Sequence, residues 1–468
     1  MKKQIAHLNG DLAHAKRVHM VGIGGCGMSG LALVMKRLGF SITGSDIACN
    51  ASVKKLRKSG FRISVGHKKT NLASNTDLVV YSSAIDIKKN PETREAARRS
   101  MSLMRRGTLL ANIAQFKRSI GVSGTHGKST TSSFIGFILN YLKFEPTVIV
   151  GGEIRDLGTN TVFTDNDLLV METDESDGSF LETKPWIIVA TNVDNDHVEH
   201  YGSIQNLRNA FVKHLNCAPD DGWVIACKDD AELRENILPH VYSRCLTYGI
   251  KEKADLSARS LKKHGNGYSF SLTFKGKNIG SFATGIAGMH NVYNAMAAML
   301  AAHMAGASWV SISRVAHRFT GTRRRLEILG THHGITFLDD YAHHPTAIKA
   351  VLDCARDFYP GKRLIAYFQP HRFTRTMAVH RQFGDAFKGS DFVWVAPIYK
   401  ANEKPIPGVT SELVLRSLRR KKVPCGHAPL RPVEIMRHLE DGDLFITAGA
   451  GDVWRVAEDI IRRLDMKK

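Results

Sequence analysis

The sequence lacks the features that mark several protein classes. No apolar run approaches the roughly 18 residues needed to span a bilayer, and the start MKKQIAHLNGD has no apolar core of the kind a secretory signal needs. Seven cysteines, an odd number, occur without CxxC pairs or a zinc-type histidine spacing. This argues against a disulfide framework and a zinc module. We therefore expect a cytoplasmic protein with no membrane partner.

Acidic residues are scarce relative to basic ones. The chain has 44 aspartates and glutamates against 65 lysines and arginines, a formal net charge of +21. Such a charge predicts a positive field that attracts anionic ligands or nucleic acid. We favour a plainer interpretation, in which the excess is spread over solvated helix faces such as KKLRKSG and LRSLRRKK. No RNA-binding, finger or helix-turn-helix signature accompanies the charge, so we expect no nucleic-acid partner.

Strand-length apolar runs alternate with helical segments through most of the chain. VHMVGI precedes a helical segment over residues 28–38, and LIAYF precedes another over 374–387. Repeated units of this kind predict an α/β protein with doubly wound parallel sheets. Residues 255–285 differ, because the alternating YSFSLTF lies between the turn signals GNG and KGK. We predict a β-hairpin insertion there.

The length predicts about three domains. Glycine-bearing elements near Gly22 and Gly124, and a new strand–helix series after FTGTRRRLEILG, look like domain starts. We expect domains over residues 1–107, 108–321 and 322–468.

The first glycine loop follows a strand and precedes a helix. Gly22-Ile23-Gly24-Gly25-Cys26-Gly27 fits GxGxxG, and Asp46 ends the next strand, where a ribose-binding acid belongs. Taken alone, the loop suggests a nicotinamide dehydrogenase. The pyrophosphate it cradles could equally belong to a UDP-sugar, and a ligand-free tight turn stays open. Cys26, at a predicted helix N-terminus, is either a reactive thiolate or a small filler in the turn.

The second glycine loop carries more chemistry. SIGVS leads into Gly124-Thr125-His126-Gly127-Lys128-Ser129 and then a helix, although strict Walker spacing fails because Val122 replaces the first glycine. Backbone amides can cradle phosphates, Lys128 can neutralise them, and the Ser129 hydroxyl can hold Mg²⁺. Glu172, at the end of the strand LLVME, suits a second magnesium contact. A kinase, a transporter ATPase, a GTPase and a ligase all remain open.

Together the motifs resemble the Mur ligases of peptidoglycan synthesis. The resemblance rests on ordered blocks over nearly the whole chain: GIGGCGMSG, GSD, YSSAI, GTHGKSTT, ETDESDGSF, TNVDNDHVEHYG, GMHNVYNAMAA, FTGTRRRLEILG, DDYAHHPT, FQPHRFTRT and GAGDVW. It implies a Rossmann-like N-terminal domain for UDP, a central P-loop domain for ATP and a Rossmann-like C-terminal domain for the amino acid. Sister ligases carry a carboxylated lysine where this chain has Phe211, with Lys213 two residues away, so Lys213 is assigned no role. Two further departures are GKS for the usual GKT and Thr108 for a common glutamate.

The pattern is most similar to members that join L-alanine to UDP-N-acetylmuramate through an acyl-phosphate. This implies ATP and Mg²⁺ as cofactors, two small-molecule substrates and an early cytoplasmic step of peptidoglycan synthesis. The alternative is a recycling ligase that attaches murein tripeptide to the same nucleotide sugar. A dehydrogenase would explain only the first loop, and a basic nucleic-acid-binding ATPase only the charge.

The resemblance also implies site residues. For catalysis it implies Lys128, His197, Arg325 and His344. For ATP it implies Gly124, Thr125, His126, Gly127, Lys128, Ser129, Thr130, His290, Asn291, Asn294, Arg325 and Asp340. For the UDP-sugar it implies Gly22, Gly24, Gly25, Gly27, Ser45, Asp46, Ser83, Glu175 and Ser176. For the amino acid it implies His344, Arg372 and Arg375, with His343 on the same loop, and for the metal Ser129, Glu172 and His197.

Overall fold

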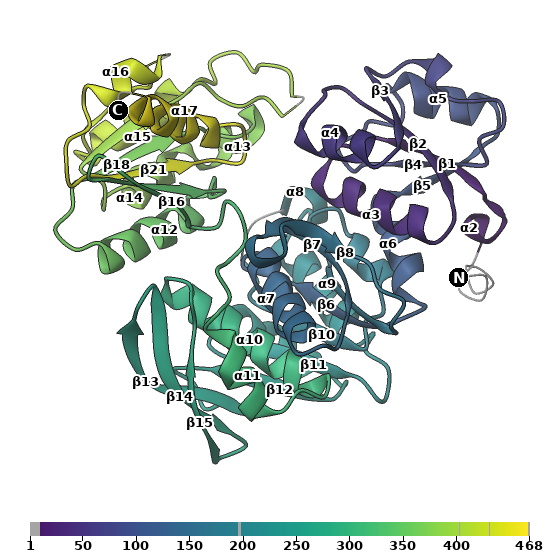
Figure 1. Cartoon of the computed structure of the whole chain (residues 1–468), viewed down its shortest axis with the longest axis horizontal. Helices are drawn as coiled ribbons and strands as arrows, with labels where there is room; N and C mark the ends of the chain where they lie inside the picture. The colour runs from purple at the N-terminus through teal and green to yellow at the C-terminus, as the bar shows by residue number, and fades with distance from the viewer. Residues whose placement is uncertain (1–9, 195–197, 402, 430, 467–468) are drawn as a thin grey trace. The chain divides into compact units, whose positions relative to one another are not determined.

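The computed structural model describes residues 10–194, 198–401, 403–429 and 431–466. It contains three β-sheets of five, ten and six strands, each with helices packed against it (Figure 1). The chain divides into two compact units. The first unit comprises residues 1–262, 269–284 and 293–320, and the second comprises 263–268, 285–292 and 321–468.

The first sheet is fully parallel, with strand order β3-β2-β1-β4-β5. Its strands are β1 (Arg17–Val21), β2 (Ser41–Asp46), β3 (Arg62–Val65), β4 (Leu78–Tyr81) and β5 (Ser102–Arg105). Its helices are α3 (Cys26–Arg37), α4 (Ala51–Lys58), α5 (Pro91–Arg98) and α6 (Arg106–Ala114), with a short α2 (Asp11–His14) before β1. Two helices begin at asparagine caps, because Asn50 accepts from the Val53 amide and Asn90 from the Glu92 amide. The helix predicted over 28–38 is confirmed as α3.

The second sheet is mixed, in the order β15-β14-β13-β12-β11-β10-β6-β9-β7-β8. Its inner strands are β6 (Arg118–Ser123), β7 (Thr147–Ile154), β8 (Thr159–Val162), β9 (Leu168–Glu172), β10 (Ile187–Ala190), β11 (Trp223–Cys227) and β12 (Cys245–Gly249). Its helices are α7 (Lys128–Tyr141), α8 (Val198–Tyr201), α9 (Ile204–Leu215), α10 (Met289–Met304) and α11 (Trp309–Ala316). Residues 129–139 of α7 are small or apolar, and all of them are buried. Tertiary packing of this kind stabilises the helix and so holds the glycine loop that precedes it in place.

The predicted β-hairpin insertion is confirmed, but it has three strands where a hairpin has two. β13 (Leu256–His264), β14 (Gly267–Phe274) and β15 (Lys277–Ala283) continue the second sheet beyond β12, and β14 pairs antiparallel with β15. The turn signals GNG and KGK lie at the two connections. The insertion therefore shares backbone hydrogen bonds with the central sheet.

The third sheet has the order β16-β17-β21-β18-β19-β20, and only the edge strand β16 is antiparallel. Its strands are β16 (Glu327–His332), β17 (Ile335–Asp340), β18 (Leu364–Phe368), β19 (Phe392–Val395), β20 (Cys425–His427) and β21 (Leu444–Ala448). Its main helices are α12 (Pro345–Phe358), α13 (Phe373–Val379), α14 (Phe383–Ala386), α15 (Glu412–Arg420), α16 (Pro432–Met436) and α17 (Trp454–Asp465).

The α/β prediction is thus confirmed, with one correction. The single helix expected over 374–387 is broken into α13, a 3-10 turn at His380–Gln382 and α14. The break begins at Val379, whose φ of −114° and ψ of 2° depart from helical values. No helix among the described residues is long and apolar enough to cross a membrane.

Candidate active site

The second glycine loop, residues 124–127, lies at the carboxyl end of β6 and leads directly into α7. β6 pairs in parallel with β9 on one side and β10 on the other, so three strand ends meet here. The backbone is left-handed at both loop glycines, with φ of +126° at Gly124 and +84° at Gly127. A Cβ on Gly124 would also overlap the Thr191 hydroxyl. The loop therefore requires glycine for conformation and for space.

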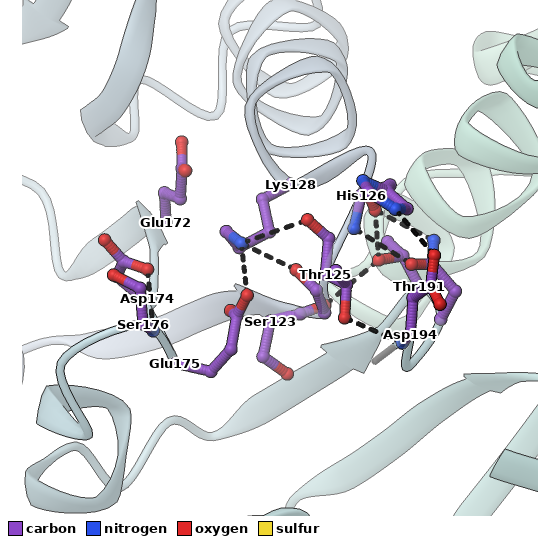
Figure 2. A network of polar contacts seen from close by, with 12 residues as sticks. Ser123, Thr125, His126, Lys128, Glu172, Asp174, Glu175, Ser176, Thr191 and Asp194 are labelled. Carbon is purple, nitrogen blue, oxygen red and sulfur yellow. Dashed lines mark hydrogen bonds and ion pairs between the residues drawn. The ribbon is translucent and has the colours of Figure 1, made fainter. Parts of the chain in front are cut away.

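Lys128 points back across this loop. Its Nζ donates to the Gly124 carbonyl at 2.7 Å and to Glu175 Oε1 at 2.8 Å (Figure 2). The side chains of Lys128 and Glu175 are only 11% and 1% exposed, so the pair is screened from water. Burial opposes the lysine charge, but Glu175, Asp174 and Glu172 outweigh it, and the pKa of Lys128 is raised. Lys128 is therefore a fixed cation beside the second glycine loop.

Glu175 is the partner that sequence reasoning missed. Burial and the neighbouring Asp174 raise its pKa to about 7, while Lys128 pulls it down. The sequence resemblance assigned Glu175 to the UDP-sugar, whereas the structure places its carboxylate on Lys128. The only sequence signal was its position in ETDESD, three residues beyond the end of β9. Ser176, its neighbour, is half-buried and donates its amide to Asp174 Oδ1.

Ser129 and Glu172 form a set of oxygen donors next to the loop. Glu172 Oε2 accepts from the Ser129 hydroxyl at 2.8 Å and from the Gly151 amide at 2.9 Å. A hydroxyl and a carboxylate brought together beside a phosphate cradle fit Mg²⁺, which prefers oxygen ligands and shares them with phosphates. Within the described residues no three His, Cys, Asp or Glu side chains gather as a metal site. His197, the third predicted ligand, lies outside the described residues.

The far side of the loop is braced by the residues after β10. The Asn192 side chain accepts from the His126 amide at 2.9 Å, and the Thr191 hydroxyl donates to the His126 carbonyl at 2.6 Å. Asp194 contacts the His126 ring at 3.2 Å, and its amide donates to the Thr125 hydroxyl (Figure 2). These contacts fix the loop's shape. The block TNVDNDH signalled the segment but not this bracing role.

The predicted adenine-side residues lie around the start of α10. Asn294 is buried, and its Oδ1 accepts from the Thr131 hydroxyl at 3.2 Å, which places it against the phosphate loop and α7. Asn291 belongs to the second unit and donates to the Ala287 carbonyl at 2.6 Å. His290, also in the second unit, has an exposed side chain.

The first glycine loop is stabilised by the acid predicted to bind a ribose. Asp46 Oδ2 accepts from the Gly24 amide at 2.8 Å, and the side chain is buried. Ser45, predicted to contact the UDP-sugar, lies in the interior instead, where its hydroxyl donates to the buried Glu92 at 2.5 Å. Ser83 is exposed on the loop after β4. Asp46 and Ser45 thus shape the loop, because its amides at Gly22, Ile23 and Gly24 donate to them, while Ser83 is exposed.

Of the two alternatives for Cys26, a reactive thiolate or a small filler in the turn, the surroundings of its sulfur favour the second. Its thiol donates to the Gly151 carbonyl at 2.8 Å and accepts from Asn160 at 3.2 Å. Although the side chain is partly exposed, the protein packed around the sulfur desolvates it and raises the pKa of the thiol. The helix N-terminus does not overcome that desolvation, so the thiol form is favoured.

In the second unit, three consecutive arginines precede β16. Arg325 is exposed, and its guanidinium lies over the Tyr341 ring at 5.3 Å. Arg324 binds the buried Asp339 at 3.0 Å and donates to the carbonyls of Gly449 and Gly451. Its backbone is left-handed, with φ of +60°, and its guanidinium also lies over the Tyr341 ring, at 5.1 Å.

Asp340, predicted to bind the ribose, ends β17 beside these arginines. It is buried and accepts from the amides of Leu326 and Ala342, both at 2.6 Å. Burial raises its pKa to about 6, and Arg325 opposes the shift. His343 and His344 follow on the same loop, and His344 caps α12.

The predicted amino-acid clamp lies at the start of α13. Arg372 is exposed with φ of +68°, and its amide donates to the Tyr399 carbonyl. Arg375 contacts His371 Nδ1 at 3.2 Å. Burial, then Arg375 and Arg372, lower the pKa of His371 to about 4, so the ring is neutral and can accept from Arg375. His371, which orients one of the two arginines, was missed because four-residue spacing alone does not reveal a contact.

Comparison with known proteins agrees with this architecture. Three domain families match the chain: "Mur ligase family, catalytic domain" over 17–118, "Mur ligase middle domain" over 122–302 and "Mur ligase, glutamate ligase domain" over 324–451. The UDP-N-acetylmuramate–L-alanine ligases of Endomicrobium trichonymphae and Aquifex aeolicus are each 40% identical, covering 95% and 97% of this chain and 98% and 99% of theirs. The crystal structure of UDP-N-acetylmuramate-alanine ligase from Thermotoga maritima, 27% identical, matches with a TM-score of 0.83, covering 97% of this chain and 100% of that one. This chain belongs to the Mur ligase family.

Proposed function

We propose that this enzyme is an ATP-dependent ligase that joins L-alanine to UDP-N-acetylmuramate. The observation that carries the proposal is the phosphate loop with Lys128 and the Ser129–Glu172 pair, in a chain about 40% identical to ligases of that name. In this proposal residues 1–107 bind the UDP-sugar, residues 108–321 bind ATP and residues 322–468 bind the amino acid. The reaction belongs to the cytoplasm, where both nucleotides are found.

The chemistry divides into two steps. A carboxylate oxygen of UDP-N-acetylmuramate attacks the γ-phosphorus of ATP, and the bond to ADP breaks to give an acyl-phosphate. The amine of L-alanine then attacks the acyl carbon, phosphate leaves, and the nitrogen loses its extra proton. Lys128 holds transferring phosphate charge, because a buried, fixed cation is worth more there than in water. Bound Mg²⁺ would supply Lewis-acid stabilisation of the phosphates, with Ser129, Glu172 and His197 as its protein ligands.

The second unit supplies the remaining roles. Arg325 is assigned to the γ-phosphate, and Asp340 and Asn291 are assigned to the nucleoside side. Arg372 and Arg375 hold the amino acid's carboxylate, for which a guanidinium fork is suited. His344 lies near the reacting groups. These assignments follow the family's motifs position by position.

The alternative substrate is a murein tripeptide. A murein peptide ligase from Psychrobacter arcticus has a similar structure, with a TM-score of 0.73 at 22% sequence identity. This similarity shows a common fold and gives no support for a tripeptide substrate. The test is phosphate release from ATP with UDP-N-acetylmuramate, with L-alanine, glycine, L-serine, D-alanine or the tripeptide as acceptor. We expect L-alanine to be preferred and D-alanine to fail. Preference for the tripeptide would reject the proposed acceptor, and no acceptor-dependent release would reject the ligase.

A further inference from the structure

The net charge of +21 is concentrated in one part of the chain. Residues 1–107 contain 20 lysines and arginines against six aspartates and glutamates, a net charge of +14. Residues 47–76 contain seven lysines and arginines and no acidic residue at all. Binding one nucleotide diphosphate does not require so many charges. The basic residues do lie on solvated faces, as expected, but the excess is not shared equally among the parts of the chain.

The structure brings these seven residues to one edge of the first sheet. β3 is the edge strand, α4 contacts it, and a 3-10 turn at Lys69–Asn71 follows it (Figure 1). We call this surface the basic edge. It comprises Lys54, Lys55, Arg57, Lys58, Arg62, Lys68 and Lys69, all of them exposed.

The basic edge has no counter-charge of its own. The ion pairs around the first sheet join Arg17 to Asp77, Lys89 to Asp86, and Arg98 and Arg99 to Glu95. Within the described part of the chain none of the seven takes part in such a pair. On α4, Lys54 and Lys58 are one turn apart with no acidic residue on the helix, so they repel one another. An external anion would relieve this repulsion.

The composition of the surface indicates which anion. Five of the seven are lysines, compact point charges that suit a diffuse negative surface, whereas arginine forks suit individual phosphates. Arg57 already donates to the Ile63 carbonyl at 2.6 Å. Phe61, the one aromatic residue of 47–76, is buried, so no exposed ring is available for base stacking.

Exposed apolar side chains lie at the same end of the sheet. Ile47, just after β2, is 60% exposed, and Val65, the last residue of β3, is 48% exposed. Basic residues on an amphipathic helix next to exposed apolar side chains are typical of proteins that bind anionic membranes at the surface. α4 has this character, since it buries Val53 and Leu56 and exposes its lysines.

We propose that the basic edge docks the protein peripherally on an anionic lipid bilayer. None of the seven residues belongs to the two glycine loops or to the other predicted ligand-binding residues, so we expect docking to leave ligation intact. This revises the expectation of no membrane partner, which the sequence supported only for spanning segments. Because the attraction is electrostatic, binding weakens as ionic strength rises.

The test uses the full chain and sedimentation with phosphatidylcholine vesicles, with or without phosphatidylglycerol. One variant combines Lys54→Gln, Lys58→Gln, Lys68→Gln and Lys69→Gln. A matched control combines Arg416→Gln, Arg420→Gln, Lys422→Gln and Arg437→Gln, all exposed in the second unit. Each variant lowers the formal charge of +21 by four, to +17. Ligase activity and melting temperature report folding.

We expect binding only to vesicles with phosphatidylglycerol. Each lysine near such a surface is worth roughly fivefold, so the basic-edge variant should bind about 10²–10³-fold more weakly at low salt. The control should change by only a few-fold, and both variants should keep ligase activity. Equal losses in the two variants, equal binding to neutral vesicles, or no vesicle binding would each overturn the proposal. Binding of RNA in place of vesicles, lost with the same four lysines, would make nucleic acid the partner instead.

Discussion

Replacing Lys128 with methionine removes the cation of the phosphate loop while keeping the length of its stem. Loss of one preorganised group acting on developing charge costs on the order of 10²–10³ in rate, about 2.7–4 kcal/mol. The structure supports a value at the upper end, because the lysine is nearly buried and already held at 2.7–2.8 Å by two acceptors. We expect kcat to fall by about 10³, with UDP-sugar binding retained.

The same substitution leaves Glu175 in the interior without its cation. Removing one partner of a buried ion pair costs about 3–5 kcal/mol when the other charge persists. The pKa of Glu175 is already about 7, and losing Lys128 raises it further, so the carboxyl can take up a proton near neutral pH. A carboxyl whose folded pKa is raised stabilises the fold at low pH and loses that contribution as pH rises. The variant should therefore be close to wild type in stability at about pH 6 and clearly weaker at about pH 8.5.

The assay is steady-state phosphate release, with melting temperatures measured across that pH range. Lys213→Met is the matched control, because Lys213 is exposed on α9 and has no assigned role. It should leave both rate and melting temperature unchanged. Near-wild-type turnover by a folded Lys128→Met protein would refute the phosphate-loop assignment. A stability difference that does not grow with pH would refute the role given to Glu175.

Four further substitutions test other parts of the fold. Arg375→Ala should raise the KM for L-alanine tens-fold or more, as expected for a charged partner of a carboxylate; an equal rise in the KM for ATP would argue against an amino-acid clamp. His214→Gln should reduce the dependence of stability on pH at acid pH, because burial lowers the pKa of His214 to about 3. The wild-type protein therefore loses about 1.4 kcal/mol of unfolding free energy per pH unit below about 6.5. Urea unfolding at two pH values checks this, and an unchanged slope in the variant would contradict it. Arg324→Met should lower the melting temperature, and more at neutral than at acid pH, because it leaves the buried Asp339 without its ion-pair partner. Arg325→Met should lower turnover but leave the melting temperature unchanged. The reverse outcome would exchange the roles of the two arginines.

Local sequence signals were enough for most of the architecture. LIAYF became β18, and the strand expected to end at Asp46 became β2, because each is a strand-length run bounded by polar or turn residues. The helices after the two glycine loops were also predictable, because each follows a strand and a glycine-rich turn and has apolar residues that recur with helical spacing. Only the backbone of Val379 broke an expected helix, and no proline or glycine marked that break.

The site was predictable as a set of residues but not as a set of pairs. A glycine loop, a lysine and a strand-end glutamate announce phosphate chemistry by their order alone. The choice of Glu175 over Glu172 as the lysine's partner depends on how three strand ends converge, which a linear pattern does not encode. The Cys26 thiol likewise contacts Gly151 and Asn160, more than 120 residues away in sequence, and burial of the sulfur raises its pKa although the Asn160 hydrogen bond opposes the shift.

The three arginines before β16 show why such pairings matter for function. All three are identical in chemistry and adjacent in sequence, so charge alone would make any of them a phosphate ligand. Arg324 has a left-handed backbone, and its side chain donates three hydrogen bonds, to Asp339 and to two carbonyls. Arg323 is 59% exposed and meets Glu327 only at 3.8 Å. Arg324 and Arg325 both pack on the Tyr341 ring, and of these two Arg325 is the exposed one. An exposed guanidinium that is oriented by a ring suits a transferring phosphate, so we predict that Arg325 binds it.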